Sequence, residues 1–402
     1  PVTFNYGDNT SGLTLGVKKS LGDEDFVFYE DHYVLVGLER EIISNYTEFS
    51  GMNIGVVRDD ASYISSYLTN VSNLTLSQYD SEEELLEAFS QNEDIQYMIV
   101  PLSIYLDVIL ENDYYINYHL SDIKLYYVIQ GNDDTLTHIL EKFYRNWYIE
   151  NLDPYLKRAE FSLFTTSLGI SETEIDAMQS VTYNYGFINN SPYEVIMSGN
   201  YGGIIAMYLS DFSRFSNIEF NYTKYRNLNR FEKAIGNGDV DLYFNYYNLD
   251  DGYYNIDSNL VIRYSVIANH ENNLVVNSIQ SLVGKTVYVE ENSYLHNYLK
   301  SIDGIDIETY EDENDLKKLN RQDVIIVIDK NIFDIYSGSN LSNYTERYSS
   351  SLNETYDFKS RTDSAFYKLF SKYAMVLDNN EAIYDGMYSH SMTVKTGSIL
   401  GT

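Results

Sequence analysis

The residue types best suited to catalysis or metal binding are sparse in this chain. None of the six histidines in 402 residues falls in an H-E-x-x-H or comparable metal-ligand spacing. The sequence contains no G-x-S-x-G and no G-x-G-x-x-G motif, and Gly284-Lys285-Thr286 lacks the upstream glycine of a P-loop. We therefore expect no catalytic residue, no metal site and no cofactor in this segment. The histidines are His32, His119, His138, His270, His296 and His390.

Charge and cysteine content exclude further classes of function. Acidic side chains outnumber basic ones by 60 to 27, and the formal net charge is −33. Such a chain repels phosphate backbones, so nucleic acid is not an expected partner, and the charge suits a soluble, surface-exposed protein. The acidic runs at 23–25 and 250–251 lack the glycine and terminal glutamate of an EF-hand loop. The absence of cysteine excludes disulfides and thiolate sites.

The elements that would position a site come in two copies. One copy runs from Gly51 (GMNIGVVRDDASYISSYL) and the other from Val283 (VGKTVYVEENSYLHNYL), and Tyr67 matches Tyr298 at an offset of 231 that also relates later pairs. Each copy predicts strand, helix, strand, helix, buried strand, helix. This alternation is typical of a mostly parallel sheet covered by helices, so the predicted fold class is α/β.

An amphipathic helix is predicted after each copy. Its apolar residues recur at i, i+3, i+4 and i+7, and we expect both stripes to face a core. The first stripe is Leu136, Ile139, Leu140, Phe143 and Trp147, and the second is Phe366, Leu369, Phe370 and Tyr373.

A different α/β block, roughly 181–268, lies between the copies, whereas only about thirty-five residues, from PVTFNYGDNTSG onward, are present for a comparable block before the first copy. We therefore expect two modules. The first covers 1–165, with a truncated leading lobe and a second lobe at about 45–130. The second covers 180–390, with one lobe at about 181–270 plus 360–390 and another at about 275–350. The boundary is expected at 163–178, where SLGISETEIDAM predicts a short capped helix.

Short motifs in the second module occur in the order found in a known family. They are Tyr185-Gly186-Phe187, Pro192-Tyr193, Gly199 with Gly203-Ile204, Asn237-Gly238-Asp239-Val240-Asp241, Gly284-Lys285-Thr286-Val287-Tyr288-Val289, and the strand Ile325 to Asp329. The chain thus resembles family 3 bacterial extracellular solute-binding domains, the type-II periplasmic-binding-protein or Venus-flytrap modules. That resemblance implies tandem modules, each with two α/β lobes joined by a hinge and a ligand crevice between them.

The resemblance also implies candidate ligand contacts. Asp329 matches a position that often holds a ligand amine, with a capping role as the alternative. Asn292 and Ser293 precede a helix whose free N–H groups suit an anion, with a purely structural N-cap as the alternative. The first-lobe candidates are Tyr193, Phe244, Asn245 and Tyr246, whose aromatic rings either stack on a ligand or fill a core. The abundance of tyrosine, 42 residues, is explained either by a bias toward AT-rich codons or by enrichment in a binding cleft.

One departure concerns the ligand. Amino-acid-binding members carry an arginine that grips a carboxylate. Asp257 lies near that place here, and Arg263 is out of register. We therefore do not predict an amino-acid ligand. Pro101 occupies the first-module position equivalent to Asp329, which argues against an amine clamp there.

Tandem modules of this kind resemble receptor ectodomains. We expect the extracytoplasmic ligand-sensing region of a receptor from a Gram-positive bacterium, with a histidine-kinase or GGDEF/EAL output domain. Its partners would be an unknown small solute, a membrane reached through segments outside this chain, and a second copy in a homodimer. The apolar stretch 99–110 is broken by Asp107 and is too short to span a bilayer. The alternatives are a solute-binding lipoprotein of an ABC transporter and a cell-surface interaction module that binds no ligand.

Overall fold

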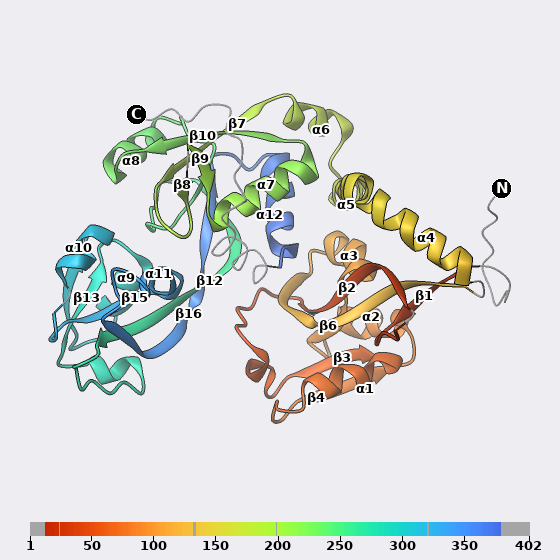
Figure 1. The fold of residues 1–402 in the computed structure, drawn as a ribbon, viewed down its shortest axis with the longest axis horizontal. Helices are drawn as coiled ribbons and strands as arrows, with labels where there is room; N and C mark the ends of the chain where they lie inside the picture. The colour runs from red at the N-terminus through yellow and green to blue at the C-terminus, as the bar shows by residue number, and fades with distance from the viewer. Residues whose placement is uncertain (1–12, 24, 132–133, 198, 320, 379–402) are drawn as a thin grey trace. The chain divides into compact units, whose positions relative to one another are not determined.

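The computed structural model describes residues 13–23, 25–131, 134–197, 199–319 and 321–378. The chain divides between Ile170 and Ser171 into two compact units, and each is considered by itself (Figure 1). Parts of the predicted modules, 1–12 and 379–390, lie outside the described residues. Within the described ranges, no helix combines the length and apolarity that crossing a membrane requires.

The first unit is built on a six-stranded mixed sheet in the order β1-β6-β2-β5-β3-β4. Strands β5, β3 and β4 run parallel, and β2 and β6 form a long antiparallel ribbon beside them. The strands are β1 (Leu13–Lys18), β2 (Phe26–Gly37), β3 (Asn53–Val57), β4 (Thr75–Tyr79), β5 (Tyr97–Pro101) and β6 (Tyr115–Gly131).

Helices cover both faces of this sheet because alternate residues of β3 point to opposite sides. Ile54 and Val56 share one buried cluster with Ala61 and Ile64 of the first helix. Gly55 points the other way and leaves room for the second helix, since a Cβ there would lie 2.6 Å from Leu85 Cδ1. The helices are α1 (Arg58–Tyr67), α2 (Glu82–Gln91), α3 (Leu102–Glu111), α4 (Asp134–Trp147) and α5 (Asp153–Ser167).

The second unit has an eight-stranded mixed sheet in the order β10-β7-β11-β16-β12-β15-β13-β14, and a separate pair, β8 and β9. Two long antiparallel strands, β12 and β16, lie at its centre and join a parallel half on each side. The strands are β7 (Thr182–Ile188), β8 (Val195–Met197), β9 (Asn200–Gly202), β10 (Glu219–Tyr225), β11 (Leu242–Phe244), β12 (Tyr254–Asn269), β13 (Thr286–Glu290), β14 (Asp306–Tyr310), β15 (Ile325–Asp329) and β16 (Tyr344–Ser360).

Most helices of the second unit begin at a side-chain cap, but α7 and α12 do not. The predicted capped helix is present, with a capping box between Ser171 and Glu174. The core of the first half lies where Phe212 meets Phe366 and Phe370 edge-on. The helices are α6 (Glu172–Gln179), α7 (Ile204–Ser216), α8 (Leu228–Gly236), α9 (Tyr294–Lys300), α10 (Glu313–Lys318), α11 (Lys330–Tyr336) and α12 (Ala365–Val376).

The first unit repeats the ribbon and the second half of the other unit's sheet. The sequence β3-α1-β4-α2-β5-α3 matches β13-α9-β14-α10-β15-α11, as predicted. The pairing registers agree as well, because Gly55 pairs with Met98 as Tyr288 pairs with Ile326. The ribbon β2–β6 corresponds to β12–β16, and each ribbon leads into the amphipathic helix predicted after it. Residues 26–37 therefore form a ribbon strand equivalent to β12.

The prediction that both amphipathic stripes face a core is wrong for α4. Ile139 and Phe143 are 59% and 63% exposed, and α4 has no buried residue. In the second unit, by contrast, Phe366, Leu369 and Phe370 of α12 are buried against α7. No counterpart of α7 occurs among the described residues of the first unit, so α4 lacks the helix that would cover it.

Candidate functional site

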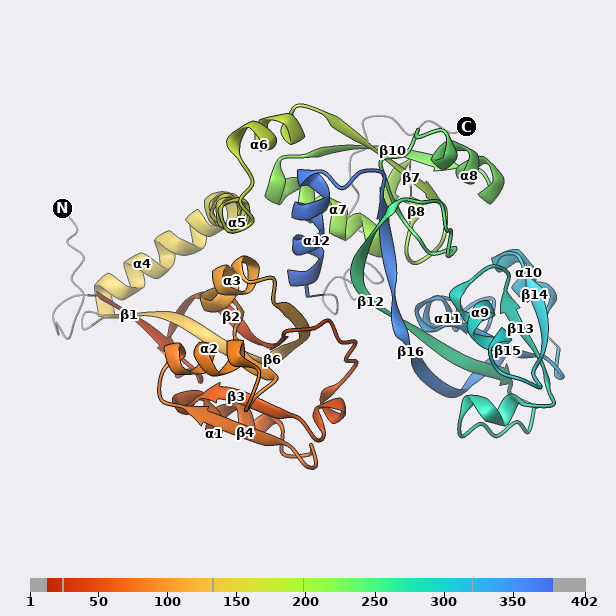
Figure 2. The same cartoon turned by 180° about the vertical axis from the view of Figure 1, so that it is seen from behind.

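The ribbon of β12 and β16 is the hinge between two lobes of the second unit (Figures 1 and 2). At one end β16 pairs with β11, and at the other β12 pairs with β15. The first lobe is 171–257 with 357–376, and the second lobe is 264–350. Between the lobes the ribbon changes register twice, after Asp257 and after Val261, and Asn259 has a φ of +64°. Such irregularities bend a strand pair locally.

Asp329 lies at the crevice edge of the second lobe because it ends β15. Its carboxylate caps α11 through the Ile332 amide at 3.1 Å. It also accepts hydrogen bonds from the hydroxyls of Tyr193, at 2.7 Å, and Tyr356, at 2.5 Å. Tyr193 belongs to the first lobe, so this contact crosses the crevice, and Asn331 donates to the same tyrosine hydroxyl at 3.2 Å.

The backbone around Tyr193 is fixed by the start of α7. The first amides of the helix have no partner within it. The Ile204 amide donates to the Pro192 carbonyl and the Ile205 amide to the Tyr193 carbonyl, each at 3.0 Å. This approach requires Gly203, which has a φ of +102°, because a Cβ there would lie 2.5 Å from the Tyr193 carbonyl oxygen. Gly203 of the predicted motif thus positions the crevice tyrosine.

A second contact crosses the crevice beside the first. Glu290 ends β13, whose parallel neighbour β15 ends in Asp329, so both carboxylates reach the same sheet edge. The Glu290 carboxylate accepts a hydrogen bond from the hydroxyl of Tyr246 in the first lobe. The ring of Tyr246 stacks on that of Tyr356, with centroids 5.5 Å apart.

Aromatic rings fill the space between the lobes. The Tyr193 ring lies 5.5 Å, centroid to centroid, from both Phe244 and Tyr246, and Tyr294 meets Tyr356 edge-on at the same distance. Each of these five rings is at least nine-tenths buried. The crevice is thus packed with the protein's own side chains.

The crevice carboxylates of Asp329 and Glu290 form no ion pair with any described residue. Burial raises the pKa of Asp329, and burial together with the Asp329 charge raises the pKa of Glu290 to about 7. Near neutral pH Glu290 is therefore only partly ionised, and the charge on the pair is stabilised by tyrosine hydroxyls and by backbone amides at the start of α11.

Of the predicted site residues, Tyr193, Phe244, Tyr246 and Asp329 come together in the crevice. Asn245 is buried but binds the Leu249 backbone at 2.8 and 3.0 Å, so it shapes a turn. Ser293 caps α9 by accepting from the His296 amide at 3.1 Å, and Asn292 is exposed with a φ of +60°.

Sequence reasoning missed three polar residues of this unit. Glu290 and Tyr356 belong to the crevice contacts. Glu290 could have been predicted from the sequence, because it is the last residue of a strand parallel to the one that ends in Asp329. Glu194 is buried in the first lobe, where the hydroxyls of Tyr185 and Tyr201 donate to it. Burial raises the pKa of Glu194 to about 8.

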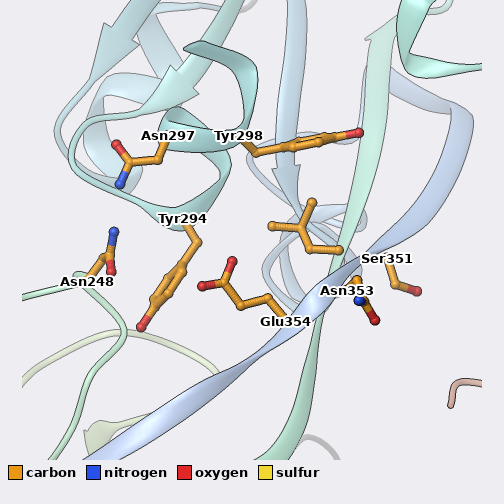
Figure 3. Close-up of a pocket in the computed structure, with 8 residues that line it drawn as sticks. Asn248, Tyr294, Asn297, Tyr298, Ser351, Asn353 and Glu354 are labelled. Atoms are coloured by element: carbon orange, nitrogen blue, oxygen red, sulfur yellow. The ribbon is translucent and has the colours of Figure 1, made fainter. Parts of the chain in front are cut away.

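A cavity of about 400 Å³ adjoins the crevice at the hinge (Figure 3). Tyr294 and Asn297 line it from α9, Asn248 from the first lobe, and Asn353 and Glu354 from β16. Its volume is within the usual range for a small-molecule pocket. Since its lining comes from both lobes and the hinge, its shape depends on how far the lobes are closed.

No family model and no curated protein matches the chain. Among solved structures, one described as VC protein is 11% identical, with a TM-score of 0.56 over 92% of this chain and 88% of that one. The likeness is one of fold. The periplasmic domain of B. pertussis BvgS is 14% identical, with a TM-score of 0.44 over 92% of this chain and 76% of that one. An ancestral arginine-binding protein is 15% identical, with a TM-score of 0.40 over 52% and 96%.

The strand order of the chain itself defines its fold class. The second unit has the two-lobed α/β fold of a Venus-flytrap module, with hinge strands between its lobes. The first unit repeats the hinge ribbon and the second lobe of that module. The predicted α/β class and the predicted resemblance to solute-binding modules are confirmed at the level of the fold.

Proposed function

We propose that this chain is the extracytoplasmic ligand-sensing region of a bacterial membrane-bound signalling receptor. In this proposal it catalyses no reaction itself, and a histidine-kinase or GGDEF/EAL output domain follows elsewhere in the full protein. The observation that carries the proposal is the hinge: two lobes joined by an irregular two-stranded ribbon and held together by hydroxyl–carboxylate hydrogen bonds. That construction is suited to switching between open and closed arrangements.

A ligand drives such a switch only by contacting the two arrangements differently. Opening the crevice removes the Tyr193 and Tyr246 hydroxyls from Asp329 and Glu290. A solute that offers hydrogen-bond donors to these carboxylates then competes with the tyrosines. We assign the crevice contacts to Tyr193, Phe244, Tyr246 and Asp329, with Glu290 added, and we place Asn292 and Ser293 at its rim.

A second candidate function for this unit follows from the filled crevice. Because its own rings already occupy the space between the lobes, the unit can remain closed without a ligand and act as a rigid coupling element. The two functions predict different responses to solutes.

The experiment measures the distance between the lobes. The chain has no cysteine, so a Glu232→Cys and Asp303→Cys pair places one spin label on an exposed position of each lobe. Amino acids, peptides and sugars that raise the melting temperature are then tested for a change in that distance. A solute that changes it supports the sensor. Stabilising solutes that all leave it unchanged support the rigid element, and a full-length gene without a transmembrane segment and an output domain refutes the receptor.

A further inference from the structure

The first unit contains a cavity of about 460 Å³ that no predicted site residue lines. It lies at the carboxyl ends of β3 and β5, lined by Val57 and Pro101, the last residue of each strand. Helices α1 and α3 begin directly after these residues. Its volume is within the usual range for small-molecule sites.

The internal repeat shows why this position is open. Pro101 pairs with Tyr33 as Asp329 pairs with Tyr264, so the cavity is equivalent to the crevice of the second unit. There the space is filled by Tyr193 and other rings of the first lobe. Among the described residues of the first unit, no element occupies the corresponding place, and the cavity remains accessible.

Negative charge dominates the walls of this cavity. Asp59, Asp60 and Glu82 line it, and the only basic side chain in the lining is Lys19. The Lys19 ammonium lies 2.7 Å from Asp60 Oδ1 and also donates to the Asp59 carbonyl. The three carboxylates do not converge within 4.8 Å, the spacing that a single metal ion would need. Their arrangement therefore suits an organic cation better than a metal.

A buried hydroxyl supplies an independent observation. Tyr33 lines the cavity and is fully buried, yet no residue that the structure describes gives its hydroxyl a hydrogen bond of ordinary geometry. Leaving such a group unpaired is costly, so a bound molecule that pairs with it would gain affinity. Ile104 and Leu125 give the cavity an apolar side, and the nearby Asp60 charge raises the pKa of Tyr33 further above the level that burial sets.

We propose that this cavity binds a small primary amine with an apolar body, held by Asp60 of α1 because Pro101 supplies no carboxylate at the position equivalent to Asp329. Its ammonium group displaces Lys19 from Asp60 and pairs with the Tyr33 hydroxyl, while its body rests on Ile104 and Leu125. The inference builds on the proposed sensor function and assigns ligand binding to the first unit. The Lys19 ammonium acts as an internal competitor, because it already occupies the position at Asp60 that the ligand would take.

The test is titration calorimetry of the full 402-residue chain with benzylamine, phenethylamine and hexylamine, each beside its uncharged alcohol. We expect saturable binding of at least one amine and none of its alcohol. Asp60→Asn should weaken it roughly tenfold or more through the lost charged hydrogen bond. Lys19→Met should strengthen it several-fold, by removing a half-exposed competing ion pair.

The matched controls are Lys18→Met and Asp25→Asn. They make the same charge changes at a neighbouring ion pair, 2.6 Å long, whose residues do not line the cavity. Binding of no amine, equal binding of amine and alcohol, or equal effects of the cavity and control variants would overturn the proposal. The outcome is separable from that of the sensor function, since it does not depend on the interlobe distance of the second unit.

Discussion

Removing the two crevice hydroxyls should make the second unit open more often. The variant is Tyr193→Phe with Tyr246→Phe, which keeps both buried rings and deletes only the hydrogen bonds to Asp329 and Glu290. A hydrogen bond to a charged group contributes about 1.5–3 kcal/mol. Asp329 keeps the Tyr356 hydroxyl and the Ile332 amide, and Glu290, with a pKa of about 7, is only partly ionised, so the low end of that range applies to each deletion.

Two such losses amount to about 3 kcal/mol if they add, which corresponds to a roughly hundredfold larger open population. Amide hydrogen exchange is the suitable assay because its rate follows the open population even when that population is small. Amides facing the crevice near 290–293 and 329–332 should exchange up to about a hundredfold faster in the variant, in proportion to that population.

The control is Tyr253→Phe. It also removes a tyrosine hydroxyl, but one that binds the Ile235 and Val240 carbonyls at 3.0 and 2.7 Å within the first lobe. In this control variant, faster exchange should be confined to residues near 228–244. If the double variant exchanged like the wild type at the crevice, or no differently from the control, the cross-crevice bonds would not hold the lobes together.

Three further outcomes are expected. The pKa of Glu194 is raised to about 8 and that of Glu290 to about 7, so the folded protein retains protons that the unfolded chain releases near pH 4.5. The melting temperature should therefore fall as the pH rises from 5 to 8.5. The Glu194→Gln variant should show a smaller fall over the same range. Gly203→Ala should lower the free energy of unfolding by about 1–3 kcal/mol through backbone strain, measured by urea denaturation. Leu369→Ala should lower it by about 2–5 kcal/mol, whereas Ile139→Ala should change it by less than about 0.5 kcal/mol, because only Leu369 is buried.

Much of the fold could be predicted from the sequence because equivalent residues of the two copies keep the same spacing along the chain. The offset between Tyr67 and Tyr298 aligns α1 with α9, and the strands around them pair in the same register. The ribbon strand at 26–37 was missed because its half-buried pattern has no matching motif in the second copy. Its equivalence to β12 is visible only through long-range pairing.

The site was predicted in part. Strand ends can be inferred locally, so Asp329 could be placed at a crevice. Tyr356 lies on the ribbon and reaches Asp329 through the twist and register shifts of the ribbon, which local patterns do not encode. The exposed stripe of α4 could not be anticipated, since periodicity reveals an apolar face but not whether another helix covers it.

The path of the chain through the ribbon has a consequence for stepwise unfolding. The polypeptide enters the second lobe along β12 and leaves it along the neighbouring β16, so residues 264–350 form one uninterrupted excursion whose entry and exit lie together. This lobe can unfold without disrupting the part of the sheet formed by β7, β10 and β11. Limited proteolysis under mild denaturant should therefore release fragments from this excursion first and leave a protease-resistant remainder containing α7 and α12.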